Sequence, residues 1–227
     1  MTMGRRHPIS ERFFLGATLT VVGGFLDAYT YLTRGRAFAT AQTGNIVLLG
    51  LRLADRDFGM ALYYFAPVFA YALGVLVAEF VKNRFRTRPR VHWRHMVLAL
   101  EFALMAAMAF IPDGEWNFLV NIAVSFTCAM QVESFRKVNG NPFATTMCTG
   151  NLRSGTEELF LWFRDHRREN LVRALQYYAI ILIFISGAIL SALLTAVLGV
   201  KSVLLCCALI AVAFVALLWE ESEEEQA

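Results

Sequence analysis

Long apolar runs constrain this chain more than any other feature of its sequence. A helix that crosses a bilayer needs about 20 predominantly apolar residues, because the hydrocarbon layer is roughly 30 Å thick. Five runs are of about this length, at 13–32, 58–81, 116–134, 174–200 and 202–219, and a shorter one covers 96–111. Only 17% of the residues are charged, against about 25% in an ordinary soluble domain. The sequence therefore predicts an all-α membrane protein, with residues 1–227 forming one membrane domain and the lipid bilayer as its partner.

The basic residues lie beside these runs, so they do not form a surface suited to nucleic acid. The net charge is +3, and residues 82–94 hold six Lys or Arg and no acid. Loops rich in Lys and Arg stay on the cytoplasmic side of a membrane. We therefore expect this loop to be cytoplasmic, and we expect no nucleic-acid partner.

A polar motif occurs twice between the apolar runs. Residues 35–45 read GRAFATAQTGN and residues 140–151 read GNPFATTMCTGN, with seven identities once one residue is inserted. We call these segments break 1 (35–45) and break 2 (140–151). Matches continue beyond them, since ALxYxA occurs at 61–66 and at 174–179. The pattern indicates an internal duplication of residues 10–112 and 115–220.

The apolar segment after each break is too short to cross a bilayer. Residues 43–54 would extend about 18 Å as a helix. If neither short segment crosses, the chain has six spans, and 16 of its 21 Lys and Arg are cytoplasmic. If both cross, it has eight spans and a split of 11 to 10. The positive-inside rule favours six spans with both termini cytoplasmic. Three spans per half make the second half inverted, so the expected fold is an inverted 3+3 repeat. Each half then has a short discontinuous, re-entrant helix that starts at Thr-Gly-Asn.

The two breaks are the best candidates for a binding site. Interrupted backbone at membrane depth must be buried in protein or line a wet cavity. The N-terminus of a short helix there offers unpaired N–H groups and a partial positive charge, which suit an anion or a polar oxygen. The expected substrate-binding residues are Thr40, Gln42, Thr43, Gly44 and Asn45 in break 1 and Thr145, Thr149, Gly150 and Asn151 in break 2.

Two features of the breaks have alternative interpretations. Thr43 and Thr149 are suited to be N-caps of the short helices. The motif might then only cap and pack these helices, because Thr and Asn also join membrane helices without touching a substrate. Residues Ser154 to Glu157 also fit a capping box, so the second short helix could begin later than Thr149.

Asp27 and Glu133 are acids at matching positions in the two halves. An acid within a span is energetically costly and is a functional hypothesis by default. If both face the breaks near a pseudo-twofold axis, either could take up and release a proton as a coupling group. Alternatively, they are helix-end acids paired with Arg34, Arg36, Arg136 or Lys137. We interpret Glu79 and Glu101 as structural.

No residue pattern indicates catalysis, a cofactor or a metal. The four cysteines form no CxxC and the four histidines form no ligand set. There is also no His-Glu metal motif, no Ser-His-Asp set and no glycine-rich phosphate loop. We therefore expect a protein that is not an enzyme, with no cofactor and no metal.

Residues 24–28 (GFLDA) and 41–50 (AQTGNIVLLG) resemble the YoaK-like family of small bacterial inner-membrane proteins of unknown function. The resemblance covers nearly the whole chain. In the second half, 131–134 reads QVES where this family pattern suggests Gln-Asn-Ala, and residues 152–163 are unusually polar. The resemblance implies a six-span protein of the bacterial inner membrane and supplies no substrate.

The leading functional hypothesis is a small transporter or channel-like permease for a small polar or anionic solute. Asp27 or Glu133 would couple it to protons. The alternative is a non-transporting membrane scaffold, sensor or accessory subunit whose breaks are packing devices. A homodimer that buries glycine and alanine faces is compatible with either hypothesis.

Overall fold

The computed structural model describes residues 13–85, 93–138, 141–143 and 145–224. Three arginines of the basic loop, Arg86, Arg88 and Arg90, lie outside the described residues. So do two residues of break 2, Gly140 and Ala144. The polar N-terminal tail before residue 13 is likewise not described.

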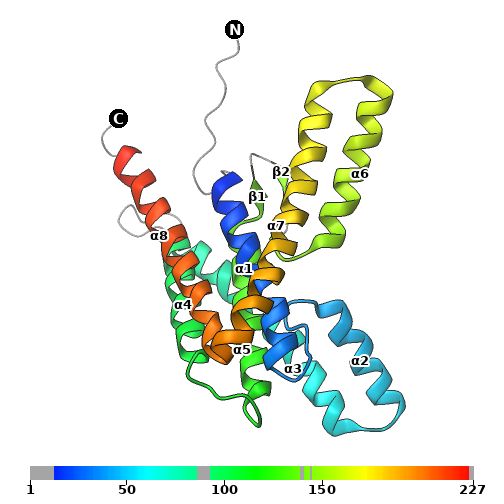
Figure 1. Ribbon diagram of the computed structural model, residues 1–227, viewed down its shortest axis with the longest axis vertical. Helices are drawn as coiled ribbons and strands as arrows, with labels where there is room; N and C mark the ends of the chain where they lie inside the picture. Colours follow the sequence, from blue (N-terminus) through cyan, green and yellow to red (C-terminus); the bar gives the residue numbers. More distant parts are fainter. Residues whose placement is uncertain (1–12, 86–92, 139–140, 144, 225–227) are drawn as a thin grey trace.

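The described chain is almost entirely helical, which confirms the all-α prediction (Figure 1). The helices are α1 (Phe13–Thr33), α2 (Gln42–Ala54), α3 (Phe58–Phe85), α4 (Trp93–Met108), α5 (Asn117–Ser134), α6 (Cys148–Asp165), α7 (Arg168–Leu198) and α8 (Leu204–Glu224). A 3-10 turn, Gly199–Val203, joins α7 to α8. Two short strands, β1 (Lys137–Val138) and β2 (Asn141–Pro142), pair antiparallel after α5.

Three helical stretches are long and apolar enough to cross a membrane. They are Phe13–Thr33, Phe58–Phe85 and the continuous stretch Arg168–Trp219, which contains α7 and most of α8. α4 has 16 residues and α5 has 18. α5 buries Asn121 and Gln131 among its neighbours. A helix covered by other helices meets little lipid, so it can carry polar side chains that a lipid-facing helix could not.

Glycines let two pairs of helices cross closely. α1 packs most extensively on α7, and α5 on α3. A Cβ atom on Gly24 would overlap the backbone carbonyl of Phe184, and one on Gly187 would overlap that of Val21. At the other crossing, a Cβ atom on Gly74 would lie 2.5 Å from the Phe126 carbonyl oxygen. Small residues that bring backbones together are typical of helix contacts in lipid.

The other packing contacts also occur in related pairs. α2 packs on α3, and α6 packs on α7. α4 and α8 pack together, and each also contacts one of the central helices, with α4 on α5 and α8 on α1. The main core lies between these four helices and contains Leu19, Phe25, Met105, Val124 and Ile210.

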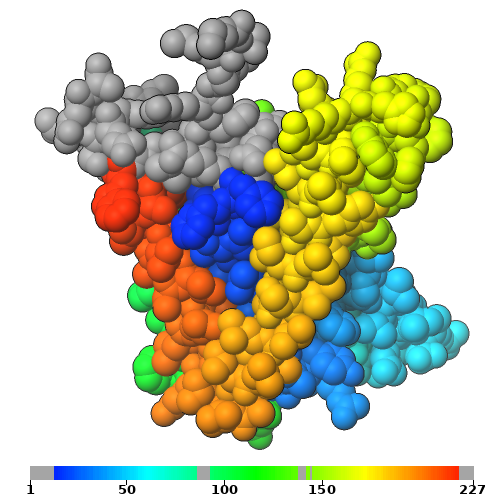
Figure 2. Space-filling model, turned by 45° about the horizontal axis from the view of Figure 1, so that its top comes forward, coloured from blue at the N-terminus to red at the C-terminus, as the bar shows by residue number. Residues whose placement is uncertain are grey.

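Two helical hairpins, α2–α3 and α6–α7, project on the same side of the molecule toward opposite ends of its long axis (Figure 1). Among the described elements, α2 contacts only α3 and α6 contacts only α7. α2 buries one residue, Asn45, and α6 buries Asn151 and Gly155. Figure 2 shows the two hairpins as separate lobes beside the bundle. Most of the surface of α2 and α6 is therefore uncovered.

Arg34 is fully buried at the end of α1. Its guanidinium donates to the carbonyls of Met108 (3.2 Å), Ile111 (2.9 Å) and Pro112 (3.0 Å). It also donates to the Tyr29 hydroxyl at 2.6 Å. Arg34 thus satisfies carbonyls that the end of α4 leaves without helical partners. It does not pair with Asp27, as one interpretation of the sequence proposed.

Candidate functional site: the paired chain breaks

The two short helices begin at equivalent positions of the duplication. α2 starts at Gln42 and α6 at Cys148, in each case one residue before Thr-Gly-Asn. The N-cap positions are Ala41 and Met147, and no side chain caps either helix. The prediction that Thr43 and Thr149 are N-caps is therefore wrong, because both lie inside the first turn. The later start at Ser154 is also wrong, because α6 is already helical from Cys148.

Break 1 is held against α1 by the Asp27 carboxylate. Thr40 is buried, and its backbone N–H (3.3 Å) and its hydroxyl (2.5 Å) both donate to Asp27 Oδ1. The backbone N–H of Ala39 donates to the Thr30 hydroxyl at 3.4 Å. Break 1 thus lies on the second half of α1.

A chain of hydrogen bonds joins the start of α2 to α5 and α3. The Gln42 amide donates to the Ala39 carbonyl at 2.9 Å and to Ser125 Oγ of α5 at 2.6 Å. The Ser125 hydroxyl donates in turn to the Pro67 carbonyl of α3 at 2.7 Å. Asn45 is buried and its amide donates to Gln42 Oε1 at 3.3 Å. Gln42 and Asn45 therefore anchor the first turn of α2 to the protein.

Break 2 is held by an amide instead of a carboxylate. The Gln131 amide of α5 donates to the hydroxyl of buried Thr145 at 2.9 Å and to the Leu19 carbonyl of α1 at 3.1 Å. The Cys128 thiol donates to Thr146 Oγ1 at 3.4 Å. On α1, a Cβ atom at Gly23 would lie only 2.8 Å from the Thr145 carbonyl oxygen. Break 2 therefore needs a glycine at this position of α1.

The two breaks lie on the same pair of helices, about one turn apart. Break 1 contacts Asp27 of α1 and break 2 contacts Gly23, a separation of about 6 Å along the helix axis. On α5, the corresponding contacts are Ser125 and Cys128, about 4.5 Å apart along that axis. These positions are near the middle of both helices. Cys148, the first residue of α6, also lies within electrostatic range of Asp27.

Each short helix presents a buried face and an open face in its first turn. Asn45 and Asn151 are buried, whereas Thr43, Gly44, Thr149 and Gly150 are exposed. A Cβ atom on Gly44 or Gly150 would have no heavy atom within 4 Å. The exposed residues stand beside the first N–H groups of each helix, which have no helical acceptor. The open faces therefore have room and donors for a ligand.

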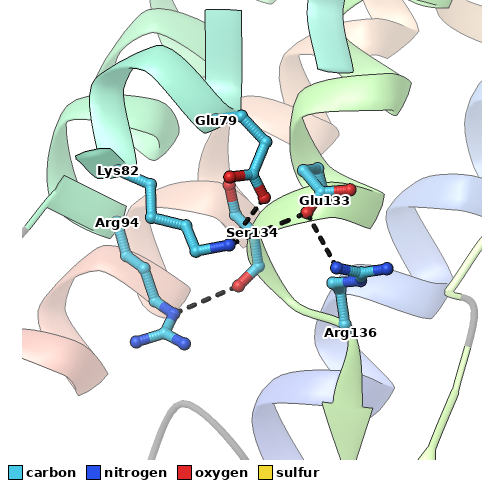
Figure 3. A network of polar contacts seen from close by, with 6 residues as sticks. All are labelled: Glu79, Lys82, Arg94, Glu133, Ser134 and Arg136. Atoms are coloured by element: carbon cyan, nitrogen blue, oxygen red, sulfur yellow. Dashed lines mark hydrogen bonds and ion pairs between the residues drawn. The ribbon is translucent and has the colours of Figure 1, made fainter. Parts of the chain in front are cut away.

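Glu133 does not contact either break in the described chain. It accepts from Arg136 at 3.2 Å and lies 4.0 Å from the Lys82 ammonium, which pairs with Glu79 at 2.6 Å (Figure 3). This geometry corresponds to the alternative interpretation of Glu133 as a helix-end acid paired with Arg136. The side chain that reaches break 2 is Gln131. Its spacing could have identified it, since Gln131 precedes Thr145 by 14 residues and Asp27 precedes Thr40 by 13.

Glu101 is a further acid in the helical core. It is fully buried in α4, and neither carboxylate oxygen has a hydrogen-bond partner among the described residues. Both Cys206 and Cys128 lie within its electrostatic range. The structure therefore gives Glu101 no ion pair that would support the structural interpretation made from the sequence.

Comparisons with known proteins place the chain in a family. A family model described as "Protein of unknown function (DUF1275)" matches residues 15–216. The chain belongs to this family. It is also similar to the UPF0700 transmembrane protein YoaK of Bacillus subtilis (strain 168), with 26% identity over 187 residues, 77% of this chain and 80% of that protein. These matches confirm the YoaK-like resemblance and support a membrane protein in contact with the bilayer. No solved structure matches the chain.

Proposed function

We propose that this DUF1275 protein is a small permease for a polar or anionic solute, built as a six-span inverted 3+3 repeat. Contacts between helix ends support the six spans. Arg34 brings the end of α1 to the end of α4, and Tyr29 bonds to the Val200 carbonyl between α7 and α8. At the opposite face, Lys82 near the end of α3 and Arg94 at the start of α4 lie beside the end of α5.

These contacts give the halves opposite directions. α1, α4 and α7 run one way, and α3, α5 and α8 run the other way, so each helix is antiparallel to its counterpart in the duplication (Figure 1). The two halves, 10–112 and 115–220, then share one membrane domain. α2 and α6 are re-entrant helices in this proposal, entering from opposite faces. The positive-inside rule places both termini on the cytoplasmic side of the bacterial inner membrane.

The proposed solute site lies at the open faces of the two breaks. The observation that carries it is the meeting of two helix N-termini on the middle of α1 and α5, about one turn apart. Paired discontinuous helices near the midplane are a common substrate site of secondary transporters. Thr43, Gly44, Thr149 and Gly150 would contact the solute. Thr40, Gln42, Asn45, Thr145 and Asn151 would hold the two helix starts in place.

Asp27 is the proposed coupling group. Its Oδ1 atom accepts from Thr40, while Oδ2 has no hydrogen bond to another described residue. Protonation of Asp27 would weaken its hold on Thr40 and so change how break 1 lies against α1. We assign coupling to Asp27 and not to Glu133, because Glu133 is engaged with Arg136 at the end of α5. We propose no catalytic reaction and no cofactor for this site.

A second copy of the chain is the proposed cover for the open faces. Exposed Thr43 and Thr149 lie in polar turns whose N–H groups lipid could not satisfy. The same side of α2 exposes Ile46, Val47 and Leu51. A homodimer through the two hairpins would place the open faces in a wet cavity between the copies and keep them away from lipid.

A liposome assay tests the permease proposal after a thermal-shift screen of small anions and polar solutes has named a candidate. We expect the purified protein to move that solute. Asp27→Asn should abolish flux with expression intact, because Asn cannot release a proton. The matched control is Glu133→Gln, which also neutralises an intrahelical acid and should keep flux. Equal flux from Asp27→Asn and the parent protein would contradict the role of Asp27.

The alternative is a non-transporting scaffold, sensor or accessory subunit. The observation that favours it is the bond chain from Asn45 through Gln42 and Ser125 to the Pro67 carbonyl, which lies entirely within the protein. In that case the breaks are packing devices. Asn45→Ala would then lower the melting temperature, and no solute in the screen would raise it.

A further inference from the structure

A basic cleft lies away from the two breaks, where α3, α4 and α5 end together. Its volume is about 260 Å³. Four cations line it, namely Lys82, Arg94, Arg136 and Lys137. They come from the end of α3, the start of α4 and the segment after α5, so the helix bundle itself brings them together. The cleft therefore belongs to the fold and not to one flexible loop.

The cations of the cleft outnumber the acids beside them. Glu79 and Glu133 are the neighbouring carboxylates, so four positive charges face two negative ones. Both acids are engaged, since Lys82 lies 2.6 Å from Glu79 and Arg136 lies 3.2 Å from Glu133 (Figure 3). Lys137 is exposed and forms no ion pair within the part of the chain that the structure describes. Two positive charges are thus left without a carboxylate partner.

Local contacts fix the position of one of these cations. The Arg94 Nε atom donates to the Ser134 carbonyl at 3.1 Å, and its guanidinium lies over the Trp93 ring, 4.7 Å from the ring centre. A guanidinium held in this way loses little freedom when it binds an anion. Stacking on tryptophan contributes further to its orientation.

The cleft lies next to apolar surface. Leu76 and Phe80, one turn apart on α3, are 67% and 68% exposed, and both lie within two turns of Lys82. Trp93 lines the cleft itself. Tryptophan and basic residues together are typical of the boundary between hydrocarbon and lipid headgroups. An amphiphile could therefore place its charged group in the cleft and its chains on α3.

We propose that this cleft binds a phosphate-bearing anion, supplied by an anionic phospholipid headgroup or by free phosphate. Arginine and lysine donors suit phosphate oxygens, and guanidinium groups can bind them in a bidentate manner. The volume of the cleft is below the roughly 300–1,000 Å³ of sites for drug-sized ligands, so it suits a headgroup and not a large cofactor. Basic pockets between membrane helices are known to hold lipid headgroups. This site is independent of the proposed permeation.

Binding is measured on the full chain, purified in a neutral detergent, from its melting temperature and by native mass spectrometry. The probes are phosphatidylglycerol, phosphatidylcholine with the same acyl chains, and sodium phosphate against sodium chloride of equal ionic strength. The double variant Arg136→Gln/Lys137→Gln should weaken binding roughly thirtyfold, at about fivefold per removed charge. The matched control Arg167→Gln/Arg168→Gln removes two exposed charges at the start of α7 and should bind as the parent does.

The probes separate the two sources of phosphate. A response to phosphatidylglycerol but not to sodium phosphate assigns the cleft to a lipid headgroup, and a response to sodium phosphate assigns it to the free anion. If the double variant is unstable without ligand, Lys137→Gln alone breaks no ion pair with a described residue and should still weaken binding about fivefold. The proposal is overturned if no phosphate probe binds in preference to its control, or if both double variants weaken binding equally.

Discussion

Break 1 and break 2 share a backbone design but differ in the group that holds them. In both, a short helix starts one residue before Thr-Gly-Asn, and a buried threonine five or six residues before its glycine bonds to a central helix. Thr40 is held by the carboxylate of Asp27, whereas Thr145 is held by the amide of Gln131. The duplication has therefore kept the geometry of the site and left a titratable group at one break only.

The short helices that follow the breaks differ in a second way. α2 carries one charged residue, Arg52. α6 carries several, and one of them, Glu158, lies 3.6 Å from Arg173 of α7. α7 has 31 residues, about 46 Å as a helix, well beyond the roughly 30 Å hydrocarbon layer. We infer that the α6–α7 hairpin extends further into water than the α2–α3 hairpin does.

The largest expected effect separates the halves at Arg34. The alignment places Asn139 opposite Arg34, so the buried guanidinium belongs to the first half only. Arg34→Met should lower the free energy of unfolding by about 3–5 kcal/mol, because it leaves several buried carbonyls without a donor. Thermal unfolding in detergent measures the loss. The control Arg36→Met changes an exposed arginine and should have little effect. Similar losses from both variants would show that the cap on α4 contributes nothing.

Exchanging the anchoring groups gives an intermediate effect. Gln131→Glu should destabilise the protein by about 1–3 kcal/mol, because a carboxylate would face the Leu19 carbonyl that now accepts a hydrogen bond. Asp27→Asn should change stability little, since the amide oxygen can still accept from Thr40. The midpoints of both variants are compared in one detergent. A larger loss from Asp27→Asn than from Gln131→Glu would reverse the comparison drawn here.

The smallest effect is expected on the open faces. Gly44→Ala and Gly150→Ala should each change stability between zero and a gain of about 0.5 kcal/mol, because the added methyl group meets no atom and alanine favours a helix. Gly23→Ala is the contrasting variant and should be destabilising, since its methyl group would press on the Thr145 carbonyl. These midpoints come from the same unfolding measurement. Clear destabilisation by Gly44→Ala would mean that the open face is covered in the folded protein.

Much of this architecture could be predicted from the sequence, because apolar length and a repeated motif follow directly from residue types. The helical class and the interruptions at both breaks are of this kind. The role of Glu133 could not be predicted in this way. The alignment set Glu133 opposite Asp27, but two positions on a helix differ by about 200° in direction, so Gln131 faces break 2 and Glu133 faces elsewhere. One inserted residue in break 2 was enough to obscure this.

Arg34 and the helix starts were missed for different reasons. An arginine at the end of a span normally reaches water, and no sequence pattern indicated that the end of α4 would need its donors. The N-cap prediction relied on the preference of threonine for that position. In the structure, Gln42 and Cys148 already lie in the first turn, and α2 and α6 use anchors on α1 and α5 instead of their own caps.

The central claim is that the two short helices start close together and diverge toward opposite faces. Pulsed electron paramagnetic resonance tests it in lipid bilayers, on a chain in which Cys128, Cys148, Cys206 and Cys207 have been replaced. Spin labels at Thr43→Cys and Thr149→Cys should lie within about 20 Å, two helix diameters. Labels at the far ends, Leu53→Cys and Arg164→Cys, should lie more than about 30 Å apart, the thickness of the hydrocarbon layer. Starts separated by more than the ends would contradict the account.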